Sequence, residues 1–191
     1  MTKPQKIEGG KKYQIIYADP PWNFKYQSVV NNTNRYERAT AHYPVMELDE
    51  IKSLPISELA DKDCVLFLWV TYPFLEKSFE LIKSWGFKYK TTAFTWVKLN
   101  KNGGVFKGMG YWTMANAEIC LLATKGHPKR VYCGVPQVIQ SVKEEHSKKP
   151  DEVRERIVVL MGDLPRIELF ARQKTDGWDT WGNEVTNDIE L

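Results

Sequence analysis

The longest apolar run of the chain consists of six residues, Val65-Leu-Phe-Leu-Trp-Val70. It is far shorter than the ~18 apolar residues that a membrane-spanning helix needs. It also lacks the polar–apolar alternation of a strand that exposes one face to water. A short continuous run of this kind is typical of a strand buried on both faces of a parallel sheet. We therefore expect a sheet with helices packed on both of its faces.

Strand and helix patterns alternate along the rest of the chain. Strands are predicted over residues 13–18, 63–70, 89–97, 117–124 and 166–171, and helices over residues 47–53, 74–85 and 150–161. The polar, aperiodic residues 25–43 predict a long loop, and the four glycines within residues 98–114 predict another. This alternation predicts an α/β fold with a mainly parallel sheet, in a single domain over residues 1–191.

The composition, 42% hydrophobic and 27% charged residues, is that of a globular protein. The first twelve residues are polar and lysine-rich and lack the apolar core of a signal peptide, so we expect a cytoplasmic protein without a membrane anchor. Three cysteines without a CxxC pair, and the dispersed His42, His127 and His146, argue against a disulfide framework and a metal site. GxGxxG, Walker and GxSxG motifs are absent from the sequence, which gives no support to dinucleotide binding, triphosphate binding or acyl transfer.

Charge is distributed unevenly, although the formal net charge is only +3. No Asp or Glu occurs between Leu81 and Ala117, whereas six lysines and eight aromatic residues fall within that stretch. Lysines neutralise phosphates and aromatic rings stack on exposed bases, so the stretch predicts a surface for nucleic acid. The alternative is that several of the rings belong to the core and the lysines form an ordinary solvated face.

The tetrapeptide Asp19-Pro20-Pro21-Trp22 directly follows the first predicted strand. An ionised Asp is purely an acceptor, and consecutive prolines leave backbone carbonyls without adjacent donors. Asp19 and a proline carbonyl therefore form a pair of acceptors suited to an –NH2 group, beside the flat wall of Trp22. Accepting both hydrogens localises the lone pair of an exocyclic amine for attack. The alternative is a tight Pro-Pro turn with a Trp in the core.

Several segments, taken in order, resemble the MT-A70 family of adenine-N6 methyltransferases. They are Asp19–Trp22, Leu66–Thr71 with Trp85-Gly86, Gly110–Trp112 with Glu118, His146–Glu152, Ile167–Arg172, and Gly177-Trp178 with Trp181–Glu184. The resemblance implies a Rossmann-like methyltransferase fold in which the catalytic tetrapeptide precedes the strand that binds S-adenosylmethionine. It also implies methyl transfer from this cofactor to the exocyclic amine of adenine without a metal. The products would be N6-methyladenine and S-adenosylhomocysteine.

The resemblance further implies roles for individual residues. The catalytic residues are Asp19 and Pro20, which accept from the target amine, and Pro21 and Trp22, which shape the base slot. Tyr43 is expected to close over the site, and Glu118 to lie near the target nucleotide. Lys149 is expected to meet the methionine carboxylate of the cofactor, and the other cofactor-binding residues are Phe170, Arg172, Lys174, Thr175, Asn183 and Glu184. Glu168 is expected to be a structural partner within the site.

Three functions are compatible with these features. The first is a DNA adenine-N6 methyltransferase, which flips its target base out of the duplex or acts on single-stranded DNA. The second is the same chemistry on RNA, since no residue recognises a 2′-hydroxyl unambiguously. The third is a catalytically silent nucleic-acid-binding subunit of a methyltransferase complex, against which the intact Asp19–Trp22 tetrapeptide argues. A homodimer or a heterodimer is compatible with each of the three.

Overall fold

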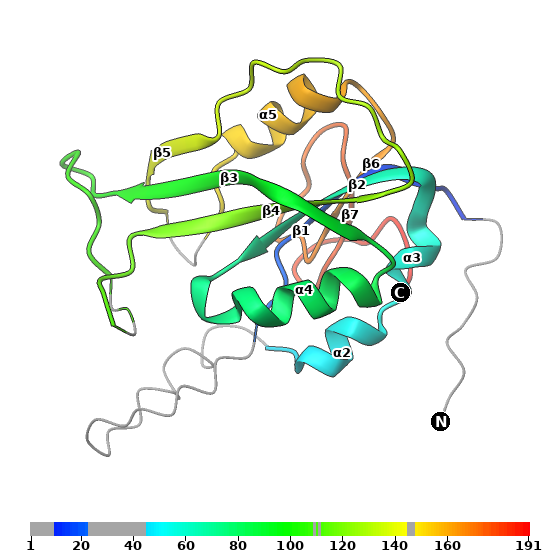
Figure 1. Ribbon diagram of the computed structural model, residues 1–191, viewed down its shortest axis with the longest axis horizontal. Helices are drawn as coiled ribbons and strands as arrows, with labels where there is room; N and C mark the ends of the chain where they lie inside the picture. Colours follow the sequence, from blue (N-terminus) through cyan, green and yellow to red (C-terminus); the bar gives the residue numbers. More distant parts are fainter. Residues whose placement is uncertain (1–9, 23–44, 109, 111, 145–147) are drawn as a thin grey trace.

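A seven-stranded sheet forms the centre of the protein (Figure 1). The computed structural model describes residues 10–22, 45–108, 110, 112–144 and 148–191. The strand order across the sheet is β5-β3-β4-β2-β1-β6-β7. In chain order the strands are β1 (Tyr13–Ala18), β2 (Ala60–Val70), β3 (Lys88–Leu99), β4 (Ala117–Lys125), β5 (Val138–Val142), β6 (Arg166–Leu169) and β7 (Asp179–Trp181).

The sheet is mixed, and β4 alone among these seven strands runs against the others. Strand β1 pairs in parallel with β2 and β6, β6 with β7, and β3 with β5. Strand β4 is antiparallel to both of its neighbours, β2 and β3. The predicted α/β fold with a mainly parallel sheet is therefore confirmed. As a consequence, the other six strands end at the same edge, where ligands bind in open α/β sheets.

Helices cover both faces of the sheet, as the apolar run in β2 predicted. Helices α2 (Leu48–Ser53), α3 (Ile56–Leu59) and α4 (Leu75–Ser84) lie on one face, and α5 (Glu152–Met161) on the other (Figure 1). A short 3-10 turn, Tyr72–Phe74, leads into α4. Leu66, Leu68 and Val70 of β2 pack on the α2–α4 side, and Val65, Phe67 and Trp69 pack on the α5 side. Period-two alternation thus fills both cores from one strand.

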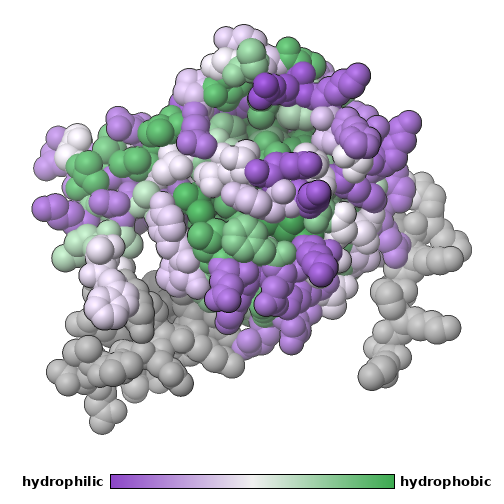
Figure 2. Space-filling model, viewed as in Figure 1, coloured by the Kyte–Doolittle hydropathy of each residue, from purple (hydrophilic) through white to green (hydrophobic). Residues whose placement is uncertain are grey.

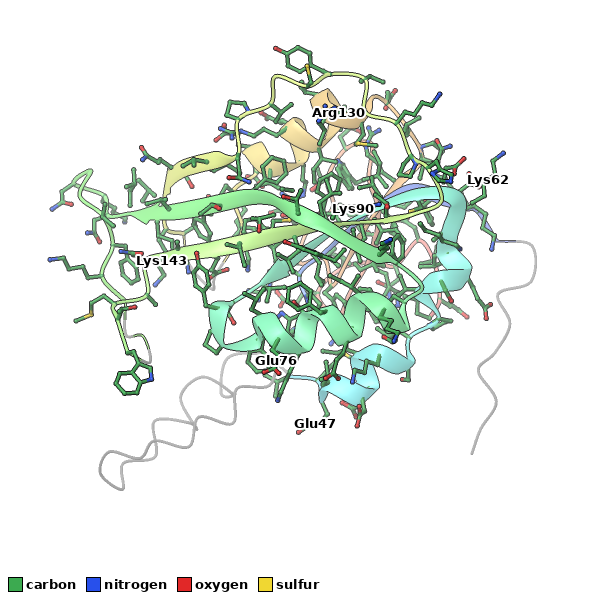
Figure 3. The ribbon with its side chains drawn as sticks, viewed as in Figure 1. Glu47, Lys62, Glu76, Lys90, Arg130 and Lys143 are labelled. Atoms are coloured by element: carbon green, nitrogen blue, oxygen red, sulfur yellow. The ribbon has the colours of Figure 1, made fainter. Side chains whose placement is uncertain are left out.

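The helices follow their apolar periodicity. In α4, Ser78, Leu81 and Ile82 are buried, a spacing of three and four residues that puts them on one face. The helix ends before Gly86, whose φ of 80° is a conformation that glycine adopts at no steric cost. In α5 the buried Val153, Ile157 and Met161 recur every four residues. Side chains from both layers fill the space beside the sheet (Figure 3).

Some elements differ from the sequence prediction. Strands β5 and β7 and helix α3 were not predicted, since each is only three to five residues long. Strand β6 ends at Leu169 instead of residue 171, because Phe170 has a φ of 60° and leaves the extended conformation. The loop predicted over residues 25–43 lies outside the described residues.

Apolar side chains are not all covered. On the face seen in Figure 2 they gather, mixed with hydrophilic ones, over the end of the molecule that holds β5 and the β3–β4 connection. Within the described part of the chain, no helix is long and apolar enough to cross a membrane.

Candidate active site

The Asp19–Trp22 tetrapeptide leaves the sheet at the edge where the parallel strands end. Ala18, the last residue of β1, is paired with Leu68 of β2 and Leu169 of β6. Asp19 therefore lies at the sheet edge between these two strands. The backbone then turns sharply, because the Trp22 N–H donates to the Pro20 carbonyl at 2.9 Å.

Both proline carbonyls already accept one hydrogen bond each. Pro20 accepts from Trp22, and the Met46 N–H donates to the Pro21 carbonyl at 3.0 Å. The expectation that these carbonyls lack adjacent donors is therefore wrong. A carbonyl oxygen has two lone pairs, so Pro20 keeps capacity for a second donor. The bond to Trp22 holds that carbonyl in one orientation.

Trp22 is largely enclosed by protein. Its exposed fraction is 5%, and its Nε1 donates to the Trp69 carbonyl at 3.2 Å. Its ring stacks on Phe74, with 5.4 Å between centroids and 28° between planes. Little of the Trp22 ring surface is therefore left for a base to stack on. In this arrangement Trp22 anchors the tetrapeptide to β2 and to the turn before α4.

Asp19 belongs to a chain of four alternating charges. The Lys149 Nζ lies 2.7 Å from Asp19 Oδ2 and 3.2 Å from Glu118 Oε2. The second oxygen of Glu118 accepts from the Lys98 ammonium. Asp19 directly follows β1, Lys149 precedes α5, Glu118 belongs to β4 and Lys98 belongs to β3. The four side chains are between 9% and 25% exposed. We call them the charge cluster. The structure thus brings together three predicted site residues, Asp19, Glu118 and Lys149.

Two tryptophans form the wall behind the charge cluster. The Lys149 Nζ lies 5.5 Å from the centroid of the Trp69 ring, and the Lys98 Nζ lies 4.9 Å from that of Trp96. Both indoles are 1% exposed. An ammonium group over an aromatic face is stabilised by the ring quadrupole. The two lysine side chains are therefore positioned by aromatic rings in a largely dry site.

The electrostatics of the cluster favour the charged forms of Lys149 and Glu118. Burial on its own would lower the pKa of Lys149, but the neighbouring Asp19 and Glu118 outweigh it and raise that pKa to about 12. Burial on its own would raise the pKa of Glu118, but the Lys149 and Lys98 ammonium groups outweigh it and lower that pKa. At neutral pH two carboxylates and two ammonium groups compensate one another.

A second buried ion pair fixes α5 against the sheet. Arg154 donates from Nε and one terminal nitrogen to the two carboxylate oxygens of Glu168, at 2.7 and 2.8 Å. Its guanidinium lies 5.6 Å from the centroid of the Tyr17 ring, and the Tyr17 hydroxyl accepts from Trp69 Nε1 at 2.7 Å. Glu168 thus has the character expected of it, a structural partner beside the site.

The predicted cofactor residues after β6 lie at the ends of β6 and β7. The Phe170 ring meets Trp181 edge-on, with 5.3 Å between centroids. Arg172 faces Glu184 with 4.0 Å between Nε and Oε1. Asn183 is exposed in the turn that follows β7. Phe170, Arg172, Asn183 and Glu184 therefore lie close to one another at these two strand ends.

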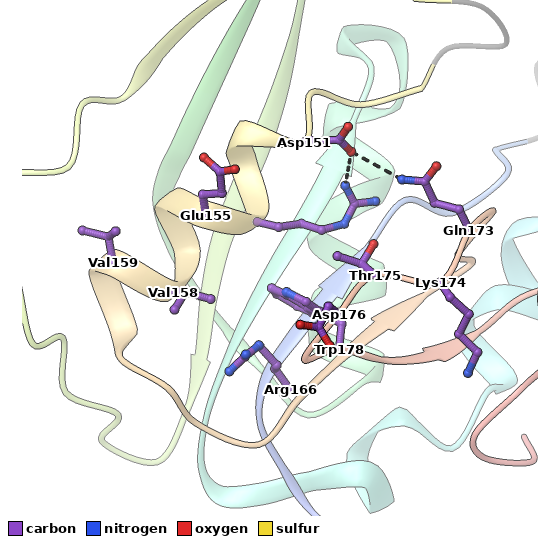
Figure 4. A pocket seen from close by; sticks show the side chains of 11 residues that line it. Asp151, Glu155, Val158, Val159, Arg166, Gln173, Lys174, Thr175, Asp176 and Trp178 are labelled. Atoms are coloured by element: carbon purple, nitrogen blue, oxygen red, sulfur yellow. Dashed lines mark hydrogen bonds and ion pairs between the residues drawn. The ribbon is translucent and has the colours of Figure 1, made fainter.

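Lys174 and Thr175 occupy a different position. They line an open pocket of about 630 Å³ between α5 and residues 173–178, with Asp151, Arg154 and Trp178 (Figure 4). Lys174 is paired with Asp188. The Thr175 hydroxyl is buried and has no hydrogen-bond partner among the described residues. Neither Asp19 nor Lys149 lines this pocket, so the pocket does not contain the expected acceptors of the target amine.

Several site residues were not predicted. Lys98 was counted only as one lysine of a basic stretch. Trp69 was noted only within a strand that resembles the family, and Tyr17 and Arg154 only as parts of a strand and a helix. Their roles depend on pairing between distant elements, which the sequence does not display. Tyr43 lies outside the described residues. Among the described residues, no group of three or more His, Cys, Asp or Glu side chains could hold a metal ion.

Known proteins match the chain over most of its length. It is 38% identical over 196 residues to the type II methyltransferase M.MunI of a Mycoplasma species, covering 95% of this chain and 82% of that protein. It is 31% identical to the human N(6)-adenosine-methyltransferase catalytic subunit METTL3 over 91% of this chain. It is 30% identical to the Drosophila melanogaster N(6)-adenosine-methyltransferase MT-A70-like protein over the same share. The chain spans only 28% and 27% of these last two relatives.

The family comparison agrees with these relatives and with the site. The MT-A70 family model matches residues 13–184, from the first residue of β1 to the Glu184 that faces Arg172. The match includes Asp19, Glu118 and Lys149 of the charge cluster. The chain therefore belongs to the MT-A70 family of adenine-N6 methyltransferases.

Proposed function

We propose that the chain transfers the methyl group of S-adenosylmethionine to the N6 amine of adenine in DNA. The observation that carries the proposal is the position of Asp19, at the common edge of the parallel strands and in contact with the buried Lys149. The preference for DNA rests on M.MunI, which is named a type II methyltransferase and is matched over 82% of its length. RNA is the second candidate, because METTL3 is named an N(6)-adenosine methyltransferase.

The residues at the strand ends fit the cofactor chemically. S-adenosylmethionine supplies an electrophilic methyl group and presents a carboxylate, a ribose diol and an adenine ring. Lys149 is a buried cation suited to the carboxylate, and Glu184 and Asn183 offer acceptors and donors to a diol. Phe170 offers an aromatic edge, and Arg172 a guanidinium held by Glu184. The unpartnered Thr175 hydroxyl and Lys174 extend this set toward α5.

The target amine would be bound by two acceptors of the tetrapeptide. Asp19 accepts one hydrogen with its carboxylate, and Pro20 accepts the other with the free lone pair of its carbonyl. Withdrawing both hydrogens from the plane of the ring localises the lone pair of a nitrogen that is otherwise conjugated. The acceptors are held before substrate arrives, Asp19 by Lys149 and Pro20 by Trp22, so their orientation costs little during the reaction.

Asp19 would also accept the proton that the methylated nitrogen loses. Formation of the nitrogen–methyl bond leaves a cationic nitrogen that must lose one proton. The Asp19 side chain is 25% exposed, so its carboxylate connects the amine to solvent and passes that proton on. Lys149 then remains the permanent cation of the site, since its pKa is raised.

The test is methyl transfer from tritiated S-adenosylmethionine to matched single-stranded DNA, duplex DNA and RNA, with nucleoside mass spectrometry of the product. The wild type should form N6-methyldeoxyadenosine. Asp19→Asn keeps the shape but replaces one carboxylate oxygen with a donor, and should lower kcat by about 100-fold or more. Calorimetric binding of S-adenosylhomocysteine should persist in this variant.

The matched control is Asp49→Asn, which changes an aspartate whose side chain is 96% exposed and lies in α2. It should leave transfer unchanged. Turnover of Asp19→Asn near that of the wild type would refute the catalytic assignment. N6-methyladenosine formed on RNA alone would move the substrate from DNA to RNA and leave the chemistry intact.

A further inference from the structure

The connection between β3 and β4 is a folded projection of the sheet. Its described residues are 100–108, 110 and 112–116, here called the β3–β4 loop, and it extends beyond the end of β3 (Figure 1). The Phe106 N–H donates to the Lys98 carbonyl at 2.8 Å. Gly108 and Ala115 exchange backbone hydrogen bonds of 2.9 and 3.1 Å across the loop. The long loop that the glycines predicted therefore has internal hydrogen bonds of its own.

Glycine is required where the loop folds back. A Cβ on Gly110 would lie 1.8 Å from the Thr113 carbonyl oxygen, and one on Gly108 would lie 2.7 Å from that of Ala115. Both neighbours are backbone atoms, which cannot move aside without unfolding the turn. The turn presents Trp112 between these two contacts, with 91% of its surface exposed.

The β3–β4 loop carries further exposed apolar and cationic side chains. Met114 and Val105 are 64% and 46% exposed. Lys101 and Lys107 lie on the same loop, and the Lys143 Nζ lies 4.8 Å from the centroid of the Phe106 ring. Lys143 is seen beside the loop in Figure 3, and the mixture of apolar and hydrophilic side chains in Figure 2. From Leu81 to Ala117 the chain has no acidic residue, so this surface complements a polyanion.

The β3–β4 loop leaves the same edge of the sheet as Asp19. Strands β3 and β1 are parallel members of one sheet, separated by β4 and β2. Three strand spacings of about 4.8 Å put their ends roughly 14 Å apart. Lys98, two residues before the loop, belongs to the charge cluster that contains Asp19. The major groove of B-DNA alone is about 12 Å wide, so one duplex can meet both features.

We propose that the β3–β4 loop enters duplex DNA beside the target adenine and that the Trp112 ring stacks in the space from which the adenine is flipped. The inference rests on the proposed function and names the duplex as its substrate. Flipping removes the stacking of the target base on its two neighbours, and an inserted indole replaces it. The lysines around the loop neutralise the flanking phosphates. Trp112 is then a positioning residue, because it acts on the duplex and not on the reacting nitrogen.

The test compares substrates that do and do not need flipping. Trp112→Ala should lower kcat/KM on duplex DNA by about 10-fold or more, the usual effect of removing one stacked base. On single-stranded DNA of the same sequence it should stay within about 2-fold of the wild type. Trp112→Phe keeps a ring and should recover most of the duplex activity. Val131→Ala, the control, changes an apolar side chain that is 70% exposed and lies outside the β3–β4 loop, and it should change neither activity.

A second readout follows flipping without catalysis. A duplex with 2-aminopurine at the target position should become more fluorescent when the wild type binds it with S-adenosylhomocysteine, because the probe leaves the stack. Trp112→Ala should reduce that rise several-fold.

Five outcomes would overturn the proposal. Equal losses on single-stranded and duplex DNA would make Trp112 a structural residue. Conversion of a dimer to a monomer by Trp112→Ala in sedimentation would make the loop an interface between copies of the chain. If Trp112→Ala leaves duplex activity and 2-aminopurine fluorescence unchanged, or if the wild type methylates only single strands, Trp112 does not insert into the duplex. The proposed methyl transfer would stand in both cases. If the wild type methylates neither DNA form, both the insertion of Trp112 and the proposed function are wrong.

Discussion

Replacing Glu118 with Gln tests whether the charge cluster stabilises the fold. Glu118 lies between the Lys149 and Lys98 ammonium groups, and its side chain is 10% exposed. The substitution preserves shape and one acceptor oxygen but removes a charge. The four-residue cluster, which has compensating charges in the wild type, then has a net charge of +1 in a largely dry site.

The expected cost follows from the geometry. At the 3.2 Å between Lys149 Nζ and Glu118 Oε2, the gross attraction is about 5 kcal/mol with an effective dielectric constant of 20. Removing one partner of a buried pair costs roughly 3–5 kcal/mol, since the other charge remains buried. The Gln carbonyl still accepts one hydrogen bond, so we expect a loss of about 2–3 kcal/mol in the free energy of unfolding. In a chain of this size the melting temperature should fall by roughly 4–12 °C.

The loss of stability in Glu118→Gln should depend on pH. The folded state lowers the pKa of Glu118 below its usual value of 4.5, so the carboxylate contributes stability above that value. The contribution is lost as the pH falls through the lowered pKa of the folded state. The difference in unfolding free energy between wild type and Glu118→Gln should therefore be largest near neutral pH and should shrink in acid. Urea unfolding followed by tryptophan fluorescence between pH 3 and 7 measures it.

The control for Glu118→Gln is a carboxylate in an exposed pair. Glu80 lies 2.8 Å from the Lys52 ammonium, but its side chain is 62% exposed. Glu80→Gln should leave the urea midpoint almost unchanged, because solvent screens that pair. If both variants unfold at the wild-type midpoint, or if the loss in Glu118→Gln does not depend on pH, the reasoning about the charge cluster is wrong.

Two further substitutions test the packing around the site. Tyr17→Phe should cost about 1–3 kcal/mol in the free energy of unfolding, because it leaves the buried Trp69 N–H without its acceptor at 2.7 Å. Chemical denaturation checks this, with the 53% exposed Tyr132→Phe as the neutral comparison. Gly182→Ala should lower both the melting temperature and the affinity for S-adenosylhomocysteine. The added Cβ would lie 2.2 Å from the Ala171 carbonyl oxygen, and the two residues directly precede Asn183 and Arg172. An unchanged calorimetric affinity would separate Gly182 from the cofactor site.

Strong periodicity made most of the fold predictable. Strand β1 was predicted with its observed bounds, and the apolar run of β2 correctly indicated helices on both faces. Strands β5 and β7 were missed because five and three residues give no readable period. The antiparallel direction of β4 could not be predicted either. Its described connection to β3 contains no crossover helix, and the sequence displays that connection only as a glycine-rich segment.

The site was predictable as a set of residue types but not as a set of contacts. Asp19, Glu118 and Lys149 were identified from motifs, yet nothing in the sequence indicated that one ammonium group joins both carboxylates. Trp22 was predicted as a wall for a base, but tertiary packing places its ring against Phe74. A motif gives the chemistry of a side chain, and its accessibility depends on elements distant in sequence.

The position of Lys149 relative to Asp19 depends on one strand register and one buried ion pair. Tyr17 is paired with Glu168 across β1 and β6, although 150 residues separate them along the chain. Glu168 holds Arg154, and Arg154 also lies over the Tyr17 ring, so β1, β6 and α5 are fixed to one another. Because α5 cannot slide, the segment just before it delivers Lys149 to Asp19. A register slip of one residue would turn Glu168 to the opposite face of the sheet and break this arrangement.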